Sequence, residues 1–126
     1  MSVDEISLTL PADNAFHGVA HLVVGGLAVR LDLTLEHLED LELALDALLE
    51  RTASDGDVTV RVRVLDQELK TSVGPFMSVR HELESSDQLN LARILATVCD
   101  EVEVTDRDGS EWVELTKRIE TRKDAA

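Results

Sequence analysis

The stretch from Val58 to Val64 constrains the fold more than any other part of the chain. Valine occupies every second position, and threonine or arginine stands between the valines. Successive side chains of a β-strand point to opposite faces, so this pattern predicts a strand with one buried and one solvated face. Such strands are typical of antiparallel sheets that are covered on one side, and other segments must form the covering layer.

Four further segments predict strands that can pair with this one. Each alternates apolar and polar residues or stands beside a turn signal. The dipeptides Asp66-Gln67 and Asp108-Gly109 predict turns that join two pairs of neighbouring strands into hairpins. The predicted strands are therefore Ile6–Leu10, Val58–Val64, Glu68–Val73, Glu101–Thr105 and Glu111–Ile119.

Two long helices are predicted over residues 15–30 and 35–53. Thr34 is placed to cap the second helix, whose apolar residues recur at helical spacing. We expect this second apolar face to cover the sheet with Leu38, Leu41, Leu45 and Leu48. A third helix is predicted over residues 87–99, and the segment 74–86 before it is expected to be a loop.

The first helix carries apolar residues on two sides. One stripe is expected to face the sheet and consists of Phe16, Val19, Ala20, Val23 and Leu27. The other stripe consists of Gly18, Leu22, Gly25 or Gly26, and Val29. Glycine destabilises a helix by about 1 kcal/mol relative to alanine, so these glycines need a reason. They indicate either the close approach of another backbone, or a kink or early helix end at Gly25-Gly26. The second stripe is the clearest indication of an interface in the sequence.

The predicted order of elements is β-α-α-β-β-α-β-β. One-sided strands and amphipathic helices bury their apolar faces against one another. The expected fold class is therefore α+β, a two-layer sandwich with three helices on one face of a mostly antiparallel sheet. We expect residues 1–119 to form a single domain and residues 120–126 to form a polar C-terminal tail.

The formal net charge of −14 argues against several classes of function. It arises from 26 acidic and 12 basic residues. An acidic surface repels phosphate backbones and anionic membranes, so we expect neither nucleic acid nor a membrane as a partner. Aromatic residues make up only 2% of the chain, too few for base-stacking platforms. The charge favours a partner with a basic patch, or it reflects a generally acidic proteome.

The single cysteine, Cys99, cannot form an internal disulfide and indicates a reducing, cytoplasmic location. It lies in an apolar run and is expected to be a buried small hydrophobic residue. His17 and His21 are four residues apart and could share a metal with Asp13, but a polar helix edge is the simpler explanation. We expect no metal, no cofactor and no catalytic residue.

Several short motifs resemble a known family in their order and spacing. They are Ile6-x-Leu8-x-Leu10-Pro11-Ala12, Gly26-Leu27-Ala28-x-Arg30, Glu39-Asp40-Leu41, Asp100-Glu101-Val102-x-Val104 and Leu115-Thr116-Lys117. Together they resemble the bacterial anti-sigma factors of the RsbW and SpoIIAB type, which are serine kinases with a histidine-kinase-like ATPase fold (the GHKL or Bergerat fold). The resemblance covers nearly the whole chain up to about residue 119 and implies that fold here.

The resemblance also implies three short boxes that bind ATP and magnesium in the family. The first places a glutamate base and a magnesium-binding asparagine one turn apart on a helix, and the matching positions here are Ala47 and Arg51. Alanine has no proton acceptor, and a guanidinium does not coordinate a cation. The second box has an aspartate that binds adenine, and Pro75 stands at its place. The third box is rich in glycine, but the matching segment Asp87–Leu91 has none.

The loss of these boxes leads us to expect a regulator that binds a protein and is not an enzyme. The resemblance implies a partner-switching network that controls transcription, with a sigma factor or an anti-anti-sigma (STAS) protein as partner. It also implies a homodimer, because the family dimerises. Family members contact partners through the first helix, so the candidate surface residues here are His17, Gly18, Leu22 and Arg30.

Two alternatives stay open at this point. An ATP-dependent serine kinase would need substitutes such as Asp46 and Glu50, which flank the expected face of the second helix, and it predicts nucleotide binding. A small-molecule-sensing module that reuses the nucleotide cleft predicts an open, partly apolar pocket and no protein partner.

Overall fold

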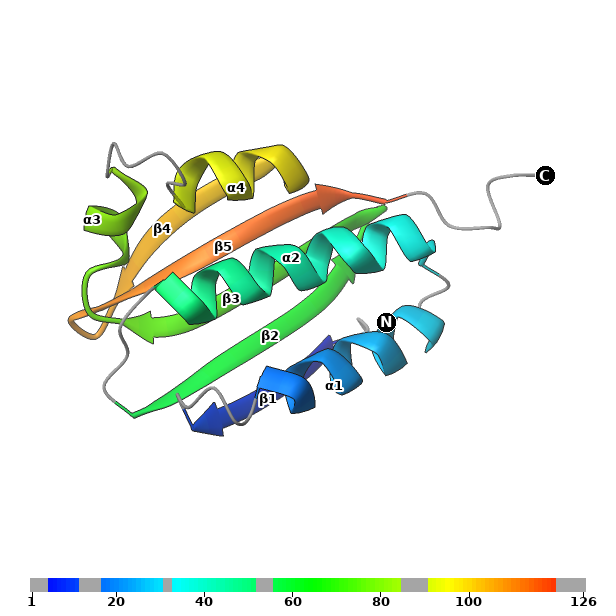
Figure 1. Cartoon of the computed structure of the whole chain (residues 1–126), viewed down its shortest axis with the longest axis horizontal. Coiled ribbons are helices and arrows are strands. Elements are labelled where there is room, and N and C mark those ends of the chain that lie inside the picture. The colour runs from blue at the N-terminus through cyan, green and yellow to red at the C-terminus, as the bar shows by residue number, and fades with distance from the viewer. Residues whose placement is uncertain (1–4, 12–16, 31–32, 52–55, 85–90, 120–126) are drawn as a thin grey trace.

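The computed structural model describes residues 5–11, 17–30, 33–51, 56–84 and 91–119. Its centre is a five-stranded sheet in which all neighbouring strands run antiparallel, in the order β1-β2-β3-β5-β4 (Figure 1). β1 and β4 are therefore the two edge strands. The strands are β1 (Glu5–Pro11), β2 (Asp57–Leu65), β3 (Glu68–Phe76), β4 (Glu101–Arg107) and β5 (Ser110–Arg118).

The described helices cover one face of this sheet (Figure 1). α2 lies across the middle of the sheet and packs against α1 on one side and α4 on the other. This arrangement confirms the predicted two-layer α+β fold. No helix in the described ranges is both long and apolar enough to cross a membrane. The helices are α1 (His17–Arg30), α2 (Leu35–Arg51), α3 (Val79–Leu83) and α4 (Leu91–Val98).

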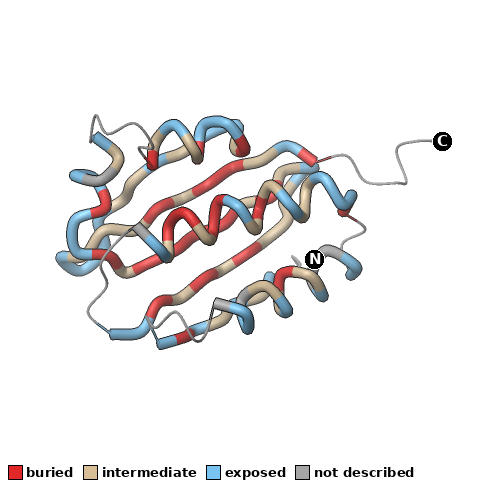
Figure 2. Tube along the Cα trace, viewed as in Figure 1, coloured by how far each residue is buried: buried red, intermediate tan, exposed pale blue. Residues whose placement is uncertain are grey.

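The core lies between α2 and the central strands (Figure 2). The Thr34 hydroxyl accepts a hydrogen bond from the backbone amide of His37 at 3.1 Å, so the predicted cap of α2 is confirmed. The predicted apolar face of α2 also faces the sheet, with Leu38 only partly buried at one end of it. Its fully buried members are Leu41, Leu45 and Leu48, which share the core with Val58, Val60 and Val62 of β2.

Both predicted hairpin turns are present. Asp66 and Gln67 have φ values of 48° and 64°, and Asp108 and Gly109 have values of 52° and 81°. Positive φ at both central residues gives a turn whose twist matches the right-handed twist of the flanking strands. These two turns fix the registers of the β2–β3 and β4–β5 pairs.

The segment after residue 73 differs from the sequence prediction. The expected loop over residues 74–86 is wrong for most of its length, because β3 continues to Phe76 and the short helix α3 spans Val79–Leu83. Phe76 and Val79 are fully buried and anchor this segment in the core. The described elements therefore follow the order β-α-α-β-β-α-α-β-β, with four helices instead of the three expected.

On α1, the described members of the stripe expected to face the sheet are not the most buried residues. Among the α1 side chains that the structure describes, Val24 is the buried one, at 3% exposed, and it belongs to neither predicted stripe. Val19, which was expected to face the sheet, is 40% exposed, and Val23 is half-buried. The side chains of Phe16, Ala20 and Leu27, the other members of that stripe, lie outside the described part. The helix is apolar nearly all round, so its pattern does not select one side for burial.

Candidate partner-binding surface and the expected nucleotide positions

One side of α1 presents apolar and small residues to solvent. Leu22 and Val29 are 77% and 84% exposed, and Gly18 and Gly26 are exposed on the same side of the helix. We call these four residues the α1 surface. They belong to the second stripe of the sequence prediction, which anticipated an interface here. Exposed apolar residues that gather on one side commonly mark an interaction site.

The glycines of α1 leave open space beside the helix. The helix runs unbroken through Gly25 and Gly26 to Arg30, so the expected alternative of an early helix end is wrong. A Cβ atom added at Gly18, Gly25 or Gly26 would meet nothing within 4 Å. Of the other residues predicted for a partner surface, Arg30 is exposed, and the side chain of His17 lies outside the described part.

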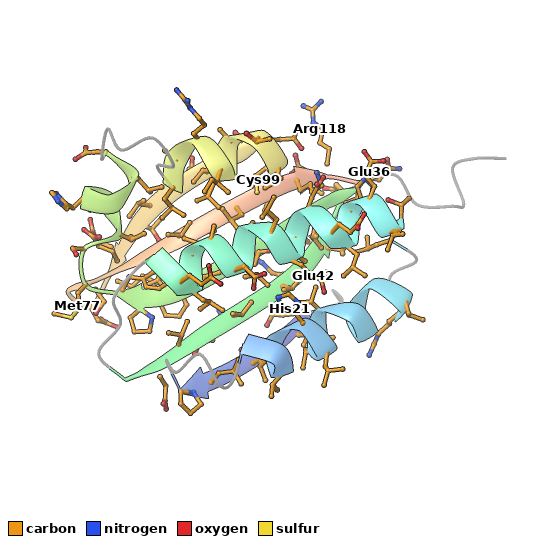
Figure 3. All side chains as sticks on the ribbon, viewed as in Figure 1. His21, Glu36, Glu42, Met77, Cys99 and Arg118 are labelled. Carbon is orange, nitrogen blue, oxygen red and sulfur yellow. The ribbon has the colours of Figure 1, made fainter. Side chains whose placement is uncertain are left out.

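A histidine fastens α1 to α2. Nε2 of His21 lies 2.7 Å from Oδ1 of Asp46, and Nδ1 lies 3.4 Å from Oε2 of Glu42 (Figure 3). The two carboxylates stand one turn apart on α2, so both can reach the same ring. His21 thus has carboxylate partners, and among the described side chains no group of three or more is placed to hold a metal ion.

The positions expected for the first nucleotide box lie near the end of α2. Ala47 is 5% exposed, and Arg51 is the last helical residue, with a side chain outside the described part. Of the two substitute carboxylates, Glu50 is exposed. Asp46 is turned by about 100° from Ala47 around the helix and bonds to His21 on α1. The structure therefore does not bring Asp46 to the face that Ala47 occupies.

The position expected for the second box lies at the end of β3. Pro75 is half-buried there. A Cβ atom on the neighbouring Gly74 would lie 2.6 Å from Cδ2 of Trp112, so the indole ring on β5 packs directly against the β3 backbone. The guanidinium of Arg107 lies 5.0 Å from the centroid of the same ring. The third expected box falls on residues 87–90, which lie outside the described ranges, and on Leu91, which is buried at the start of α4.

Two of the motifs that carry the family resemblance meet in the fold. Nζ of Lys117 on β5 lies 2.8 Å from Oδ2 of Asp40 on α2, and it donates to the carbonyl of Val98 at 2.9 Å. One ammonium thus joins β5, α2 and the end of α4. The motifs themselves are visible in the sequence, but their contact is not, because no periodic pattern links residues so far apart.

Cys99 directly follows α4 and is half-buried, whereas the sequence predicted a buried residue (Figure 3). Burial raises the pKa of its thiol from the ordinary value of 9.0 to about 11. Asp100 and Asp40 also raise the pKa, whereas the positive charge of Lys117 lowers it. The thiol therefore stays protonated at neutral pH, as expected of a residue that packs and does not react.

Comparisons of the sequence and of the structure with known proteins both find similarity to RsbW proteins. No family model matches the sequence. The serine-protein kinase RsbW of Bacillus velezensis is 25% identical over 94% of this chain and 88% of its own length. The RsbW kinase of Bacillus pumilus is 26% identical over 86% of this chain and 82% of its own. The crystal structure of the RsbU and RsbW domains of a Mycobacterium tuberculosis protein has a TM-score of 0.70 at 16% identity, over 92% of this chain and 32% of that one.

These findings correct one expectation and confirm another. The expectation that this protein is not an enzyme is wrong on this comparison, because both relatives are named serine-protein kinases and so point to kinase activity. The roles of Ala47, Arg51 and Pro75 stay predictions from the sequence. The family resemblance is confirmed: this chain is similar to the RsbW-type serine-protein kinases along nearly its whole length, and it shares their histidine-kinase-like ATPase fold.

Proposed function

We propose that this protein is a cytoplasmic regulator of transcription that acts by partner switching. In this proposal it binds a sigma factor or an anti-anti-sigma (STAS) protein, the partners that the RsbW-type resemblance implies. Similarity to two RsbW kinases over most of their length supports the family of functions. The choice of partner is our proposal.

The observation that carries the proposal is the exposure of the α1 surface. His21 and Val24 hold α1 to the body of the protein, and this attachment leaves Leu22 and Val29 in water. Covering one leucine or valine side chain fully stabilises a complex by about 1.5–3 kcal/mol. The open space beside Gly18 and Gly26 lets a partner approach the helix backbone closely. A helix with these features is well suited to receive a protein.

The charge of the protein supports the same kind of partner. With a net charge of −14, the chain attracts proteins that carry basic patches and accelerates their encounter with it. The α1 surface itself is uncharged, so electrostatic attraction brings the partner close and apolar contact then holds it. A second copy of this chain is the competing occupant of the α1 surface, since the resemblance implies a homodimer.

Serine phosphorylation of the bound partner is the second candidate function, and the names of both relatives favour it. A base for this reaction would need a carboxylate that faces the nucleotide. Glu50 is exposed on the last turn of α2, whereas Asp46 bonds to His21. Glu50 is therefore the residue to test as a substitute base.

The test of partner binding uses purified proteins. The chain is mixed with each sigma factor and STAS protein of the same organism, and complexes are separated by size-exclusion chromatography with light scattering. A complex of this chain with at least one of them supports the proposal. If every candidate elutes separately, at concentrations up to tens of micromolar, the proposed function is wrong. Light scattering of the chain alone reports whether it forms the homodimer.

The test of the kinase candidate is independent of the first. Thermal melts are recorded with and without millimolar ATP and magnesium, because a ligand at 100 times its Kd stabilises by about 2.7 kcal/mol. Any partner found is then incubated with ATP and examined for phosphoserine by mass spectrometry. Phosphoserine that is lost in Glu50→Gln but kept in Glu39→Gln supports the kinase and its base. No melting shift together with no phosphoserine rejects this candidate.

A further inference from the structure

The free edge of the sheet at β4 is only partly protected. β4 pairs with β5 on one side, and among the described residues no strand neighbours the backbone groups on its other side. The carbonyl of Val104 faces this free edge, because it accepts a hydrogen bond from Nη2 of Arg80 on α3 at 3.3 Å. Backbone groups of a strand alternate in direction, so those of Val102, two residues earlier, point to the same edge. An edge of this kind is a template for another strand.

Arg80 covers the edge at Val104 and not at Val102. Its guanidinium makes two hydrogen bonds to the Asp106 carboxylate, at 3.0 and 3.2 Å, and one to Glu111 at 3.4 Å. The hydrogen bond to Asp106 raises the pKa of the guanidinium further above its ordinary value. Within the described ranges, no side chain caps the edge at Val102 as Arg80 caps it at Val104. Charged groups that block a strand edge commonly limit pairing with other chains, and here the block stops short of Val102.

A cavity of about 430 Å³ opens beside this uncapped position. Its walls come from α3, α4 and the start of β4, and they are mostly apolar. Two acidic residues, Asp100 and Glu101, belong to its lining, and both are exposed. Oδ2 of Asp100 accepts a hydrogen bond from the backbone amide of Arg118 at 2.6 Å. The remaining lining residues are Leu83, Ala92, Ala96, Cys99 and Val102. Of the positions expected for nucleotide, neither Ala47 nor Pro75 is among the described lining residues.

We infer that the β4 edge at Val102 binds an extended segment of a partner protein, with a basic and apolar sequence. The segment pairs its backbone with the free groups of Val102. One of its apolar side chains enters the cavity, and a neighbouring lysine or arginine lies against Asp100 and Glu101. Strand addition combines backbone hydrogen bonds for affinity with side-chain pockets for specificity, and this site offers both. Two acidic residues beside the edge, on a protein with a net charge of −14, favour a basic segment.

The β4 edge at Val102 and its cavity, which together we call the groove, are separate from the α1 surface. β4 is one edge strand and β1 is the other, and α1 packs on α2 and β1. A partner can therefore occupy the groove while α1 is bound or free. Because the two sites are separate, the proposed function stands if the groove does not bind a peptide. Peptide binding at the groove likewise does not depend on the proposed function.

The test uses a short synthetic peptide in which lysine and valine alternate, labelled with a fluorophore. Binding is followed by fluorescence anisotropy at low salt, and hydrogen exchange reports the protection of the Val102 amide. We expect saturable binding and slower exchange at Val102. The same peptide with a proline at its centre, and a peptide in which glutamate replaces lysine, are expected to bind at least about ten-fold more weakly, the effect of a 1.4 kcal/mol difference.

Variants of the protein locate the site. Ala96→Trp fills the mouth of the cavity, and Val102→Pro removes the free amide on the edge without removing a hydrogen bond to β5. Each is expected to lower the affinity for the peptide by about ten-fold or more. Thr97→Trp, on the exposed side of α4, is expected to leave this affinity unchanged. Glu101→Lys is expected to weaken binding, and Glu39→Lys, with the same change in net charge, serves as its control.

Circular dichroism and thermal melts confirm that each variant is folded before its binding is compared. The proposal is overturned if the peptide does not bind, or if Ala96→Trp and Val102→Pro bind it as well as the original protein does. Equal binding of the glutamate peptide overturns the basic character of the partner. Leu22→Asp, on the α1 surface, is expected to keep full peptide binding.

Discussion

The ammonium of Lys117 lies 2.8 Å from the carboxylate of Asp40 and joins the last strand of the sheet to its central helix. The Lys117 side chain is 16% exposed, so this ion pair is largely withdrawn from water. The same ammonium donates to the Val98 carbonyl at the end of α4. Three elements of the two layers therefore depend on one side chain.

Removing one member of this pair is expected to destabilise the protein. Asp40→Ala leaves the Lys117 ammonium without its carboxylate and should lower the free energy of unfolding by about 1–3 kcal/mol. The double variant Asp40→Leu with Lys117→Met should recover part of this loss, because neither charge then remains. Urea denaturation of the original protein, Asp40→Leu, Lys117→Met and the double variant completes a double-mutant cycle that measures the coupling. Simple additivity of the two changes would show that the pair contributes nothing.

Two glycines are expected to respond in opposite directions to the same substitution. Gly74→Ala places a Cβ atom 2.6 Å from the Trp112 ring and should destabilise the protein by about 1–3 kcal/mol through overpacking. Gly26→Ala adds a Cβ atom that points into open space beside the helix, and it should stabilise the protein by about 0.5–1 kcal/mol. Urea midpoints of the two variants test this contrast. A neutral Gly74→Ala would mean that the Trp112 ring moves aside at little cost.

The thiol of Cys99 is expected to react slowly with alkylating reagents. A rise in its pKa from 9.0 to about 11 reduces the fraction of thiolate at pH 8, and hence the rate with iodoacetamide, by about 100-fold relative to a thiol of ordinary pKa. The rate should keep rising with pH until about pH 11. Mass spectrometry of timed samples gives the rate, and the denatured protein is the control. A rate that levels off near pH 9 would contradict the effect of burial on this pKa.

A charge on the α1 surface is expected to weaken partner binding without unfolding the protein. Leu22 is 77% exposed, so Leu22→Asp should leave the melting temperature nearly unchanged while it weakens the complex at least about ten-fold. Met77→Asp is the matched control, because Met77 is 64% exposed and lies away from α1 (Figure 3). Calorimetric titration with the partner compares the two variants. If both bind as the original protein does, the α1 surface is not the contact.

Several features of the fold follow directly from local sequence. The valines of β2 and the leucines of α2 repeat at the periods of a strand and a helix, and each set is buried as its period predicts. The two hairpin turns and the Thr34 cap depend on residues that lie close together in the chain. For such features the physical cause is local, so the pattern is sufficient to predict them.

The orientation of α1 is a different case. Its apolar residues surround the helix, so two stripes fit the sequence. Val24, the buried one among the α1 side chains that the structure describes, belongs to neither of them. The packing of α1 on α2 and β1 selects the buried side, together with the hydrogen bond between His21 and Asp46 and the proximity of Glu42 to the same ring. Beyond residue 73, the burial of Phe76 and Val79 likewise extends β3 and forms α3 in a segment whose local sequence indicates a loop.

The sequence by itself determined the layer architecture, the strand pairs joined by turns, the resemblance to the RsbW type and an apolar stripe on the first helix. Only the tertiary structure decided which side of α1 is exposed, that Asp46 points to His21, that Lys117 meets Asp40, and that Arg80 leaves part of the β4 edge open beside a cavity. The reason is physical. Periodicity and turn chemistry act between neighbours in the chain, whereas these contacts join residues that only the packing of complete elements brings together.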